Sequence, residues 1–156
     1  MINLALYQPE IPPNTGNLIR LCANSGARLH LIHPLGFRTD DASLRRAGLD
    51  YAEFVDIRHH ADWATFRAAL PGSRVLAFTT RGRQRYDKVV YRQDDVLLLG
   101  PESRGLPQDV IDELPEEQRI YLPMRPDNRS LNLSNAASIA VFEAWRQMGF
   151  DGAKEV

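Results

Sequence analysis

The chain has 156 residues, 44% of them hydrophobic and 25% charged, and a formal net charge of −1, which is the composition of an ordinary globular domain. No apolar run reaches membrane-spanning length, and the N-terminal MINLALYQPE lacks the basic region and cleavage site of a signal peptide. The single cysteine, Cys22, excludes a disulfide framework and lies in an apolar helical pattern typical of a core residue. We therefore expect one domain spanning residues 1–156, in a cytoplasmic setting and without a membrane partner.

Strand and helix patterns alternate from the N-terminus onward. The first predicted strand is INLALY at residues 2–7, and PEIPPN after it is expected to be a loop, because proline lacks a backbone donor. Apolar residues at helical spacing then predict a helix from Thr15 to Ser25. Gly26 is the expected end of this helix.

The rest of the chain continues the same alternation. Further strands are expected at residues 29–32, 53–57, 74–80, 95–100 and 119–123. Further helices are expected at residues 40–48, 61–70, 106–114 and 131–148. The first of these helices has Asp40 or Asp41 as its cap and Gly48 as its exit. The pattern predicts an α/β fold with a mostly parallel sheet and helices on both faces, in which ligands bind at the carboxyl ends of the strands.

Several common site motifs are absent from the sequence. No GxGxxG follows the first strand and no GxxxxGK[ST] is present, which argues against dinucleotide and phosphate-loop binding. GPESRG lacks the first glycine of a nucleophile elbow. His30 and His33 are expected to face opposite sides of a strand, and the adjacent His59 and His60 also diverge, so we predict no metal site.

Three segments rich in polar residues, two of which also contain glycine, lie where a strand is expected to end. They are NTGNLIR at residues 14–20, GPESRGLP at residues 100–107 and LPMRPDNRSLNLSN at residues 122–135. Each segment alone is also compatible with an ordinary capped helix or strand-to-helix turn. Because they follow the first strand and the last two strands, together they predict one binding site at the edge of the sheet.

The positive charge of the chain is almost entirely arginine, at seventeen of the nineteen basic residues. Arginine has a planar group that suits phosphate and stacks on bases. Local clusters occur at Arg45 and Arg46, and at Arg81, Arg83 and Arg85. A net charge of −1 provides no global attraction for nucleic acid, so a solvated surface is the alternative for these clusters.

Taken together, the three segments resemble the motifs of the SPOUT (trefoil-knot) RNA methyltransferases. EIPPNTGNLIRLCANSG, GPESRGLP and SLNLSNAASIAVFEAWRQ carry this resemblance, which covers essentially the whole chain. With RRAGLDY at residues 45–51, the sequence is most similar to the compact TrmL-type tRNA wobble-nucleotide (cytidine or uridine) 2′-O-methyltransferases, which have no separate RNA-binding domain. The resemblance implies a C-terminal trefoil knot, which the rarity of knots would otherwise argue against.

The same resemblance implies a cofactor, a substrate and site residues. The cofactor would be S-adenosyl-L-methionine, and its methyl group would go to the ribose 2′-hydroxyl of nucleotide 34 in the tRNA anticodon stem-loop. The implied catalytic residues are Arg20, Glu102, Ser130, Asn132 and Asn14. The implied cofactor-binding residues are Phe78, Thr79, Gly100, Glu102, Gly105, Leu122, Met124, Ser130, Leu133 and Asn135. RNA contacts are expected from Arg45, Arg46, Arg81, Arg83 and Arg85, and no metal is expected.

The roles of two of these residues are open at the level of sequence. A guanidinium group stays protonated in proteins, so Arg20 is expected to donate hydrogen bonds to the developing oxyanion or to the adjacent phosphate rather than act as a base. Glu102 is expected either to orient Arg20 or to accept a proton. One alternative enzyme is a base-methylating knot protein, which SLNLSNA argues against. A non-catalytic RNA-binding or assembly factor is the other alternative, and the presence of Arg20 and Glu102 disfavours it.

The last predicted helix indicates a partner subunit. From Ala136 to Trp145 it is apolar on nearly all sides, and such a helix is buried on more than one side. The resemblance implies that the second side packs on another copy of the chain. We therefore expect a homodimer, which a charge at Ala140 is expected to split.

Overall fold

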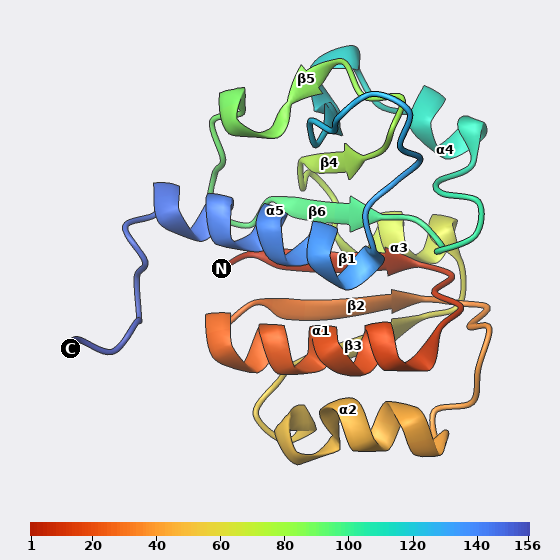
Figure 1. Cartoon of the computed structure of the whole chain (residues 1–156), viewed down its shortest axis with the longest axis vertical. Helices are drawn as coiled ribbons and strands as arrows, with labels where there is room; N and C mark the ends of the chain where they lie inside the picture. The colour runs from red at the N-terminus through yellow and green to blue at the C-terminus, as the bar shows by residue number, and fades with distance from the viewer.

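The structure is a computed structural model that describes residues 1–48 and 51–156 in full. Over this part of the chain, seven strands form one sheet in the order β3-β2-β1-β6-β4-β7-β5 (Figure 1). The strands are β1 (Asn3–Tyr7), β2 (Arg28–Ile32), β3 (Ile57–His60), β4 (Val75–Phe78), β5 (Gln84–Arg85), β6 (Val96–Leu99) and β7 (Arg119–Tyr121). Their pairings are all parallel. The predicted α/β class with a mostly parallel sheet is confirmed, while the trefoil knot stays a prediction.

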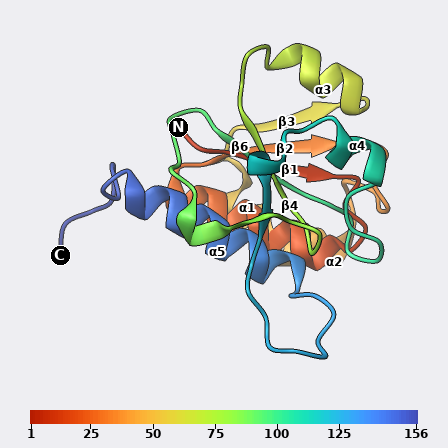
Figure 2. The ribbon, with the colours of Figure 1, turned by 90° about the horizontal axis from the view of Figure 1, so that it is seen from above.

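Helices cover both faces of this sheet, as predicted (Figure 2). One face carries α1 (Pro12–Ser25), α2 (Ala42–Ala52) and α5 (Leu133–Gln147), and the other carries α3 (Trp63–Ala69) and α4 (Gln108–Asp112). Short 3₁₀ turns are formed by η1 (Tyr86–Lys88) and η2 (Glu116–Gln118). Side chains alternate between the two layers: Leu4 and Leu6 of β1 join the core beneath α1 and α5, whereas Ala5 joins the core beneath α3 and α4.

Helix α1 begins at Pro12 rather than at Thr15, so the prediction that the whole of PEIPPN is a loop is wrong. Proline suits the first turn of a helix, because the N–H that it lacks would have no helical partner there. Gly26 ends the helix as predicted, in the left-handed conformation at φ 77°. Cys22 is confirmed as a core residue, and burial raises the pKa of its thiol to about 12.

Helix α2 begins where it was predicted but ends later. The side chain of Asp41 caps it by accepting hydrogen bonds from the amides of Ser43 and Leu44. The predicted exit at Gly48 is wrong, because the helix continues to Ala52. Because α2 extends to Ala52, the strand predicted at residues 53–57 starts later than expected, and β3 begins at Ile57.

Gly48 has a packing role instead of an end-of-helix role. A Cβ atom on Gly48 would lie 2.4 Å from the carbonyl oxygen of Gly16 on α1, and a Cβ on Gly16 would lie 2.4 Å from the Cβ of Ala47. Neither distance is compatible with a side chain. The backbones of α1 and α2 therefore touch at this crossing, and both glycines are needed for it.

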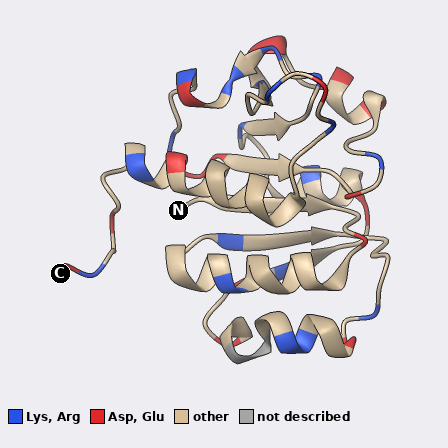
Figure 3. Cartoon of the chain, viewed as in Figure 1, with Lys and Arg blue, Asp and Glu red and all other residues tan. Residues whose placement is uncertain are grey.

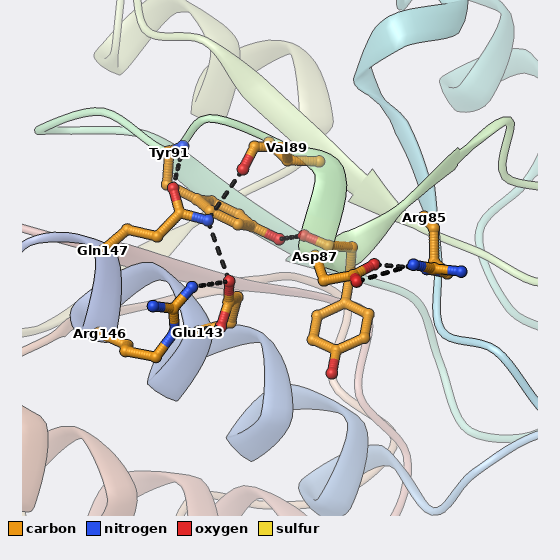
Figure 4. Close-up of polar contacts among 8 residues, drawn as sticks. Arg85, Asp87, Val89, Tyr91, Glu143, Arg146 and Gln147 are labelled. Atoms are coloured by element: carbon orange, nitrogen blue, oxygen red, sulfur yellow. Dashed lines mark hydrogen bonds and ion pairs between the residues drawn. The ribbon is translucent and has the colours of Figure 1, made fainter.

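Helix α5 is held at its C-terminal end by the segment that joins β5 to β6 (Figure 4). The side chain of Gln147 accepts a hydrogen bond from the amide of Tyr91 at 3.0 Å and donates one to the carbonyl of Val89 at 2.9 Å. The hydroxyl of Tyr91 in turn donates to the carbonyl of Tyr86 at 2.8 Å. The segment from η1 to Tyr91 thus anchors this helix, and the sequence analysis predicted neither β5 nor η1.

Only one side of α5 is covered within the protomer. The buried side consists of Leu133, Ala137, Ala140, Val141 and Ala144. On the other side Ile139 is 38% exposed and Phe142 is 45% exposed, and Phe142 lies against Trp145 and Phe150. The expectation that Ala140 lies at a subunit interface is wrong, because Ala140 is fully buried in the core of its own protomer. A charge at Ala140 would disrupt the fold before it tested any dimer.

The four histidines form two separate pairs, which join β2 and the residue after it to β3. His30 and His60 are buried with 2.9 Å between Nδ1 and Nε2, whereas His33 and His59 meet outside the core at 2.8 Å. The predicted divergence of neighbouring histidines is confirmed. Among the residues that the structure describes, no group of three or more His, Cys, Asp or Glu side chains is arranged to hold a metal ion, and no helix is long and apolar enough to span a bilayer.

The tautomers of the buried pair follow from Asn3. The side-chain nitrogen of Asn3 donates to the carbonyl of Asp94, so its oxygen faces Nε2 of His30 at 2.9 Å and accepts a hydrogen bond there. In the neutral imidazole Nδ1 of His30 then carries no hydrogen and accepts from Nε2 of His60. Burial lowers the pKa of His30 to about 4.

We predict that the protein loses stability as the pH falls from about 6.5 to about 4. The unfolded chain binds a proton at His30 near the ordinary pKa of 6.5, whereas the folded chain does so only near 4, so lowering the pH favours the unfolded state. The expected loss in the free energy of unfolding is about 3 kcal/mol. Urea unfolding at several pH values measures it. His30→Gln should show a shallower dependence, and equal slopes for the two proteins would contradict the assignment.

Candidate functional site

A cavity of about 660 Å³ opens at the carboxyl ends of β4, β6 and β7. Its volume is typical of small-molecule sites. All three segments predicted to form a site contribute to its walls, together with residues 78–81 after β4. The lining residues are Ile11, Asn14, Phe78, Thr79, Thr80, Arg81, Leu99, Gly100, Pro101, Glu102, Ser103, Arg104, Gly105, Leu106, Leu122, Met124, Arg129, Ser130, Leu131, Asn132, Leu133 and Ala136.

Glu102 fastens the loop after β6 to the start of α1. One carboxylate oxygen accepts a hydrogen bond from the amide of Glu10 at 2.8 Å, and the other accepts from the amide of Ile11 at 2.6 Å and from the side chain of Asn14 at 3.3 Å. Amides at a helix start have no helical partner and favour a nearby negative charge. Since Ile11 at the N-cap has no side-chain oxygen, Glu102 supplies the cap from a distant part of the chain.

Glu10 makes the reciprocal contact. Its carboxylate accepts hydrogen bonds from the amide of Ser103 at 2.9 Å and from the hydroxyl of Ser103 at 2.7 Å. These bonds lower the pKa of Glu10 below its ordinary value. The sequence analysis missed this residue, because it treated PEIPPN only as a loop. An acidic residue just before a helix start was the signal that was available.

Asn14 connects the first segment to the third. Its side chain donates to Glu102 and accepts a hydrogen bond from the side-chain nitrogen of Asn132 at 3.1 Å. The oxygen of Asn132 accepts hydrogen bonds from the amides of Ser134 and Asn135, so Asn132 caps α5. Glu102, Asn14 and Asn132 therefore form a continuous hydrogen-bonded chain between all three segments.

Main chain forms the wall of the cavity after β6. A Cβ atom on Gly100 would lie 2.3 Å from the amide nitrogen of Leu106, so the loop folds back directly onto the end of the strand. Gly105 adopts a φ of 66°, which glycine favours, and its amide donates to the carbonyl of Pro101 at 2.9 Å. Both glycines of GPESRG are thus required by the shape of this loop.

The structure brings most of the expected cofactor-binding residues together. Those that line the cavity are Phe78, Thr79, Gly100, Glu102, Gly105, Leu122, Met124, Ser130 and Leu133. Asn135 is not among the lining residues and is exposed on the first turn of α5. Ile11, Arg129 and Leu131 line the cavity although the sequence analysis did not select them.

Arg20 is placed differently from the other expected catalytic residues. Asn14, Glu102, Ser130 and Asn132 line the cavity, whereas Arg20 is exposed on α1 outside it. Its guanidinium carbon lies 5.0 Å from the ring centroid of Tyr51 on α2. Among the described residues Glu102 is hydrogen-bonded to the start of α1 and not to Arg20, so the structure does not support the alternative in which Glu102 orients Arg20.

The arginines expected to contact RNA have different surroundings. Arg45 and Arg46 are exposed on α2, where Figure 3 shows basic residues in blue, and Arg83 is exposed before β5. Arg81 lines the cavity and donates to the carbonyl of Leu106 at 2.6 Å. Arg85 is paired with Asp87 (Figure 4). Two of the five side chains are therefore already engaged within the protomer.

Comparisons with known proteins agree with this geometry. The model of the SpoU rRNA Methylase family matches residues 1–142. A tRNA (cytidine(34)-2′-O)-methyltransferase of Burkholderia ambifaria is 60% identical over 154 residues, which are 97% of this chain and 99% of that protein.

Solved structures are similar over nearly the whole chain. One, described as "Structural insights into the 2-OH methylation of C/U34 on tRNA", has a TM-score of 0.91 at 49% identity and covers 96% of this chain and 97% of that chain. An AdoMet-bound (S-adenosylmethionine-bound) rRNA methyltransferase from Sinorhizobium meliloti has a TM-score of 0.81 at 29% identity and covers 94% of this chain and 56% of that chain.

Proposed function

Because this chain belongs to the SpoU rRNA methylase family, we propose that it transfers a methyl group from S-adenosylmethionine to the ribose 2′-hydroxyl of nucleotide 34 of tRNA, a cytidine or a uridine derivative. The reaction would take place in the cytoplasm. The observation that carries the proposal is the convergence of the three SPOUT-like segments on one cavity, joined by Glu102, Asn14 and Asn132. A full-length relative with this activity, at 60% identity, supports it.

The cavity residues fit the proposed cofactor. Leu99, Leu106 and Leu122 provide apolar surface of the kind that suits a purine, and Thr79 and Ser130 provide hydroxyls at the same cavity. The close approach of main chain at Gly100 leaves backbone polar groups near the ligand space. When bound, S-adenosylmethionine supplies an electrophilic methyl group on a positively charged sulfur.

The residues of the chain would act mainly by alignment. A ribose hydroxyl is a weak nucleophile, and correct placement supplies much of the acceleration for such a transfer. Ser130 and Asn132 are exposed side chains at the cavity and would hydrogen-bond the ribose. Glu102 would support them indirectly, since its carboxylate already accepts hydrogen bonds from three donors at or just before the start of α1. This favours a structural role for Glu102 over proton acceptance.

Arg20 would act in the cavity of the partner subunit. It is exposed and lies outside the cavity of its own protomer, so a role in catalysis requires a second chain. There its guanidinium would donate hydrogen bonds to the 2′-oxygen as negative charge develops, or to the adjacent phosphate. The exposed Arg45, Arg46 and Arg83 would contact phosphates of the anticodon stem-loop, which places them outside the chemical step.

Exposed apolar side chains support the proposed homodimer. Ile139 and Phe142 on α5 are 38% and 45% exposed, and Ile11 and Leu131 beside the cavity are 46% and 40% exposed. Helices α1 and α5 lie side by side on the same face of the sheet (Figures 1 and 2). An apolar surface of this kind is typical of stable subunit interfaces, and its position next to the cavity would bring the partner's Arg20 close to the site.

Nucleoside analysis tests the reaction. Incubation with labelled S-adenosylmethionine and tRNA should yield 2′-O-methylcytidine or a 2′-O-methyluridine derivative at nucleotide 34. The matched control is a tRNA with a 2′-deoxy nucleotide at that position, which lacks the nucleophile and should accept no label. A methylated base, or continued labelling of the deoxy substrate, would replace the proposed reaction with base methylation. No incorporation would favour a non-catalytic RNA-binding protein.

Mixed dimers test the placement of Arg20. Arg20→Ala and Asn132→Ala are each expected to lower the rate of the homodimer by about a hundredfold or more. A heterodimer of the two variants should recover about half of the wild-type rate, because one of its two sites combines an intact cavity with the partner's intact Arg20. If Arg20 serves its own cavity, the heterodimer stays inactive. Phe142→Arg, which puts a charge on the exposed face of α5, should prevent recovery, whereas Ala64→Arg on the outer surface of α3 should not.

A further inference from the structure

The guanidinium of Arg20 has an aromatic contact that the proposed reaction does not account for. It lies 5.0 Å from the ring centroid of Tyr51, which belongs to the neighbouring helix α2. Tyr51 is partly buried against the core, while Arg20 is exposed. A cation over the face of an aromatic ring is attracted by the electrons of that face, so the ring restricts the directions that a long and otherwise mobile side chain takes.

The position of Tyr51 beneath Arg20 follows from the crossing of the two helices. Gly16 and Gly48 allow the backbones of α1 and α2 to touch, as the 2.4 Å separation between a Cβ on Gly48 and the carbonyl oxygen of Gly16 shows. Arg20 lies one turn beyond Gly16, and Tyr51 lies about one turn beyond Gly48. Arg20 and Tyr51 therefore lie on the same side of the helix crossing, each about one turn C-terminal to its glycine. The close approach of the helices at the two glycines sets the distance between the two side chains.

We infer that Tyr51 is a positioning residue for the methyl transfer, which holds the guanidinium of Arg20 in the orientation that meets the RNA. This inference rests on the proposed role of Arg20. It assigns a function to RRAGLDY, the segment at residues 45–51 that lies outside the cavity: its glycine sets the helix contact and its tyrosine orders the arginine. Tyr51 itself touches neither the ribose nor the cofactor.

The central test compares Tyr51→Phe with Tyr51→Leu. Phenylalanine keeps the aromatic face and should leave the single-turnover rate of methyl transfer within about twofold of wild type. Leucine keeps the apolar bulk but lacks the aromatic face, so the guanidinium of Arg20 would no longer be held in one orientation. The rate of methyl transfer should fall about tenfold, because a misplaced catalytic group slows the reaction even when it is present. Binding of S-adenosylmethionine and the melting temperature should be unchanged in both. Equal rates for Tyr51→Leu and wild type would overturn the inference.

A second pair of variants separates positioning from general damage. Tyr51→Leu should cause no further loss in an Arg20→Ala background, because the tyrosine acts only through the arginine. A further tenfold loss there would show that Tyr51 acts independently of Arg20, and the inference would be wrong. Arg67→Leu is the matched control, since it removes the contact between Arg67 and Trp63 at 5.6 Å on the other face of the sheet and should not change the rate.

The outcomes also distinguish this inference from the proposed function. An inactive Arg20→Ala with a fully active Tyr51→Leu removes the role of Tyr51 and leaves the role of Arg20 intact. A fully active Arg20→Ala removes both roles but leaves the methyl transfer itself, which the nucleoside analysis establishes independently.

Discussion

The structure depends on the carboxylate of Glu102 and the unpaired amides at the start of α1. Hydrogen bonds to a charged group are each worth about 1.5–3 kcal/mol and become more costly to lose when they are shielded from water. Here one side chain binds the amides of Glu10 and Ile11, which are far away in the sequence. Asn14 then extends the connection to Asn132 at the start of α5. Two helix starts and one strand-end loop are thereby held in a single arrangement, and the cavity is the space between them.

In the proposed dimer, helix α1 consequently contributes to two sites at once. Asn14 is buried and points into the hydrogen-bonded chain at the cavity, whereas Arg20, six residues later, is exposed on another side of the helix. At about 100° per residue these two positions cannot share a face. The direction of α1 is fixed at its start by Glu102 and along its length by the contact between Gly16 and Gly48. The same constraints that shape a protomer's own cavity therefore aim its arginine at the proposed partner.

Much of this arrangement could be predicted from the sequence. Alternating strand and helix patterns predicted the fold class and the position of most strands, and the three polar segments predicted a site at the edge of the sheet. The individual cavity residues followed from the resemblance to the SPOUT methyltransferases. The errors occurred where a distant contact overrides a local signal. The start of α1 at Pro12 depends on a cap from Glu102, and Gly48 continues α2 because another backbone lies against it. Similarly, no local pattern shows that Arg20 lies outside the cavity. Its position follows from the orientation of α1, which is set by the contact of Asn14 with Glu102 and Asn132 on another side of the helix.

The most direct test of this account is the protection of the Ile11 amide against hydrogen exchange in Glu102→Gln. A glutamine side chain is neutral and replaces one acceptor oxygen with a donor, so we expect exchange at Glu10 and Ile11 to be about tenfold faster and S-adenosylmethionine to bind more weakly. The control is Glu113→Gln, which alters a carboxylate bound to Trp63 on the opposite face of the sheet and should leave both amides unchanged. Wild-type protection and wild-type cofactor affinity in Glu102→Gln would contradict the claim that this carboxylate holds the site together.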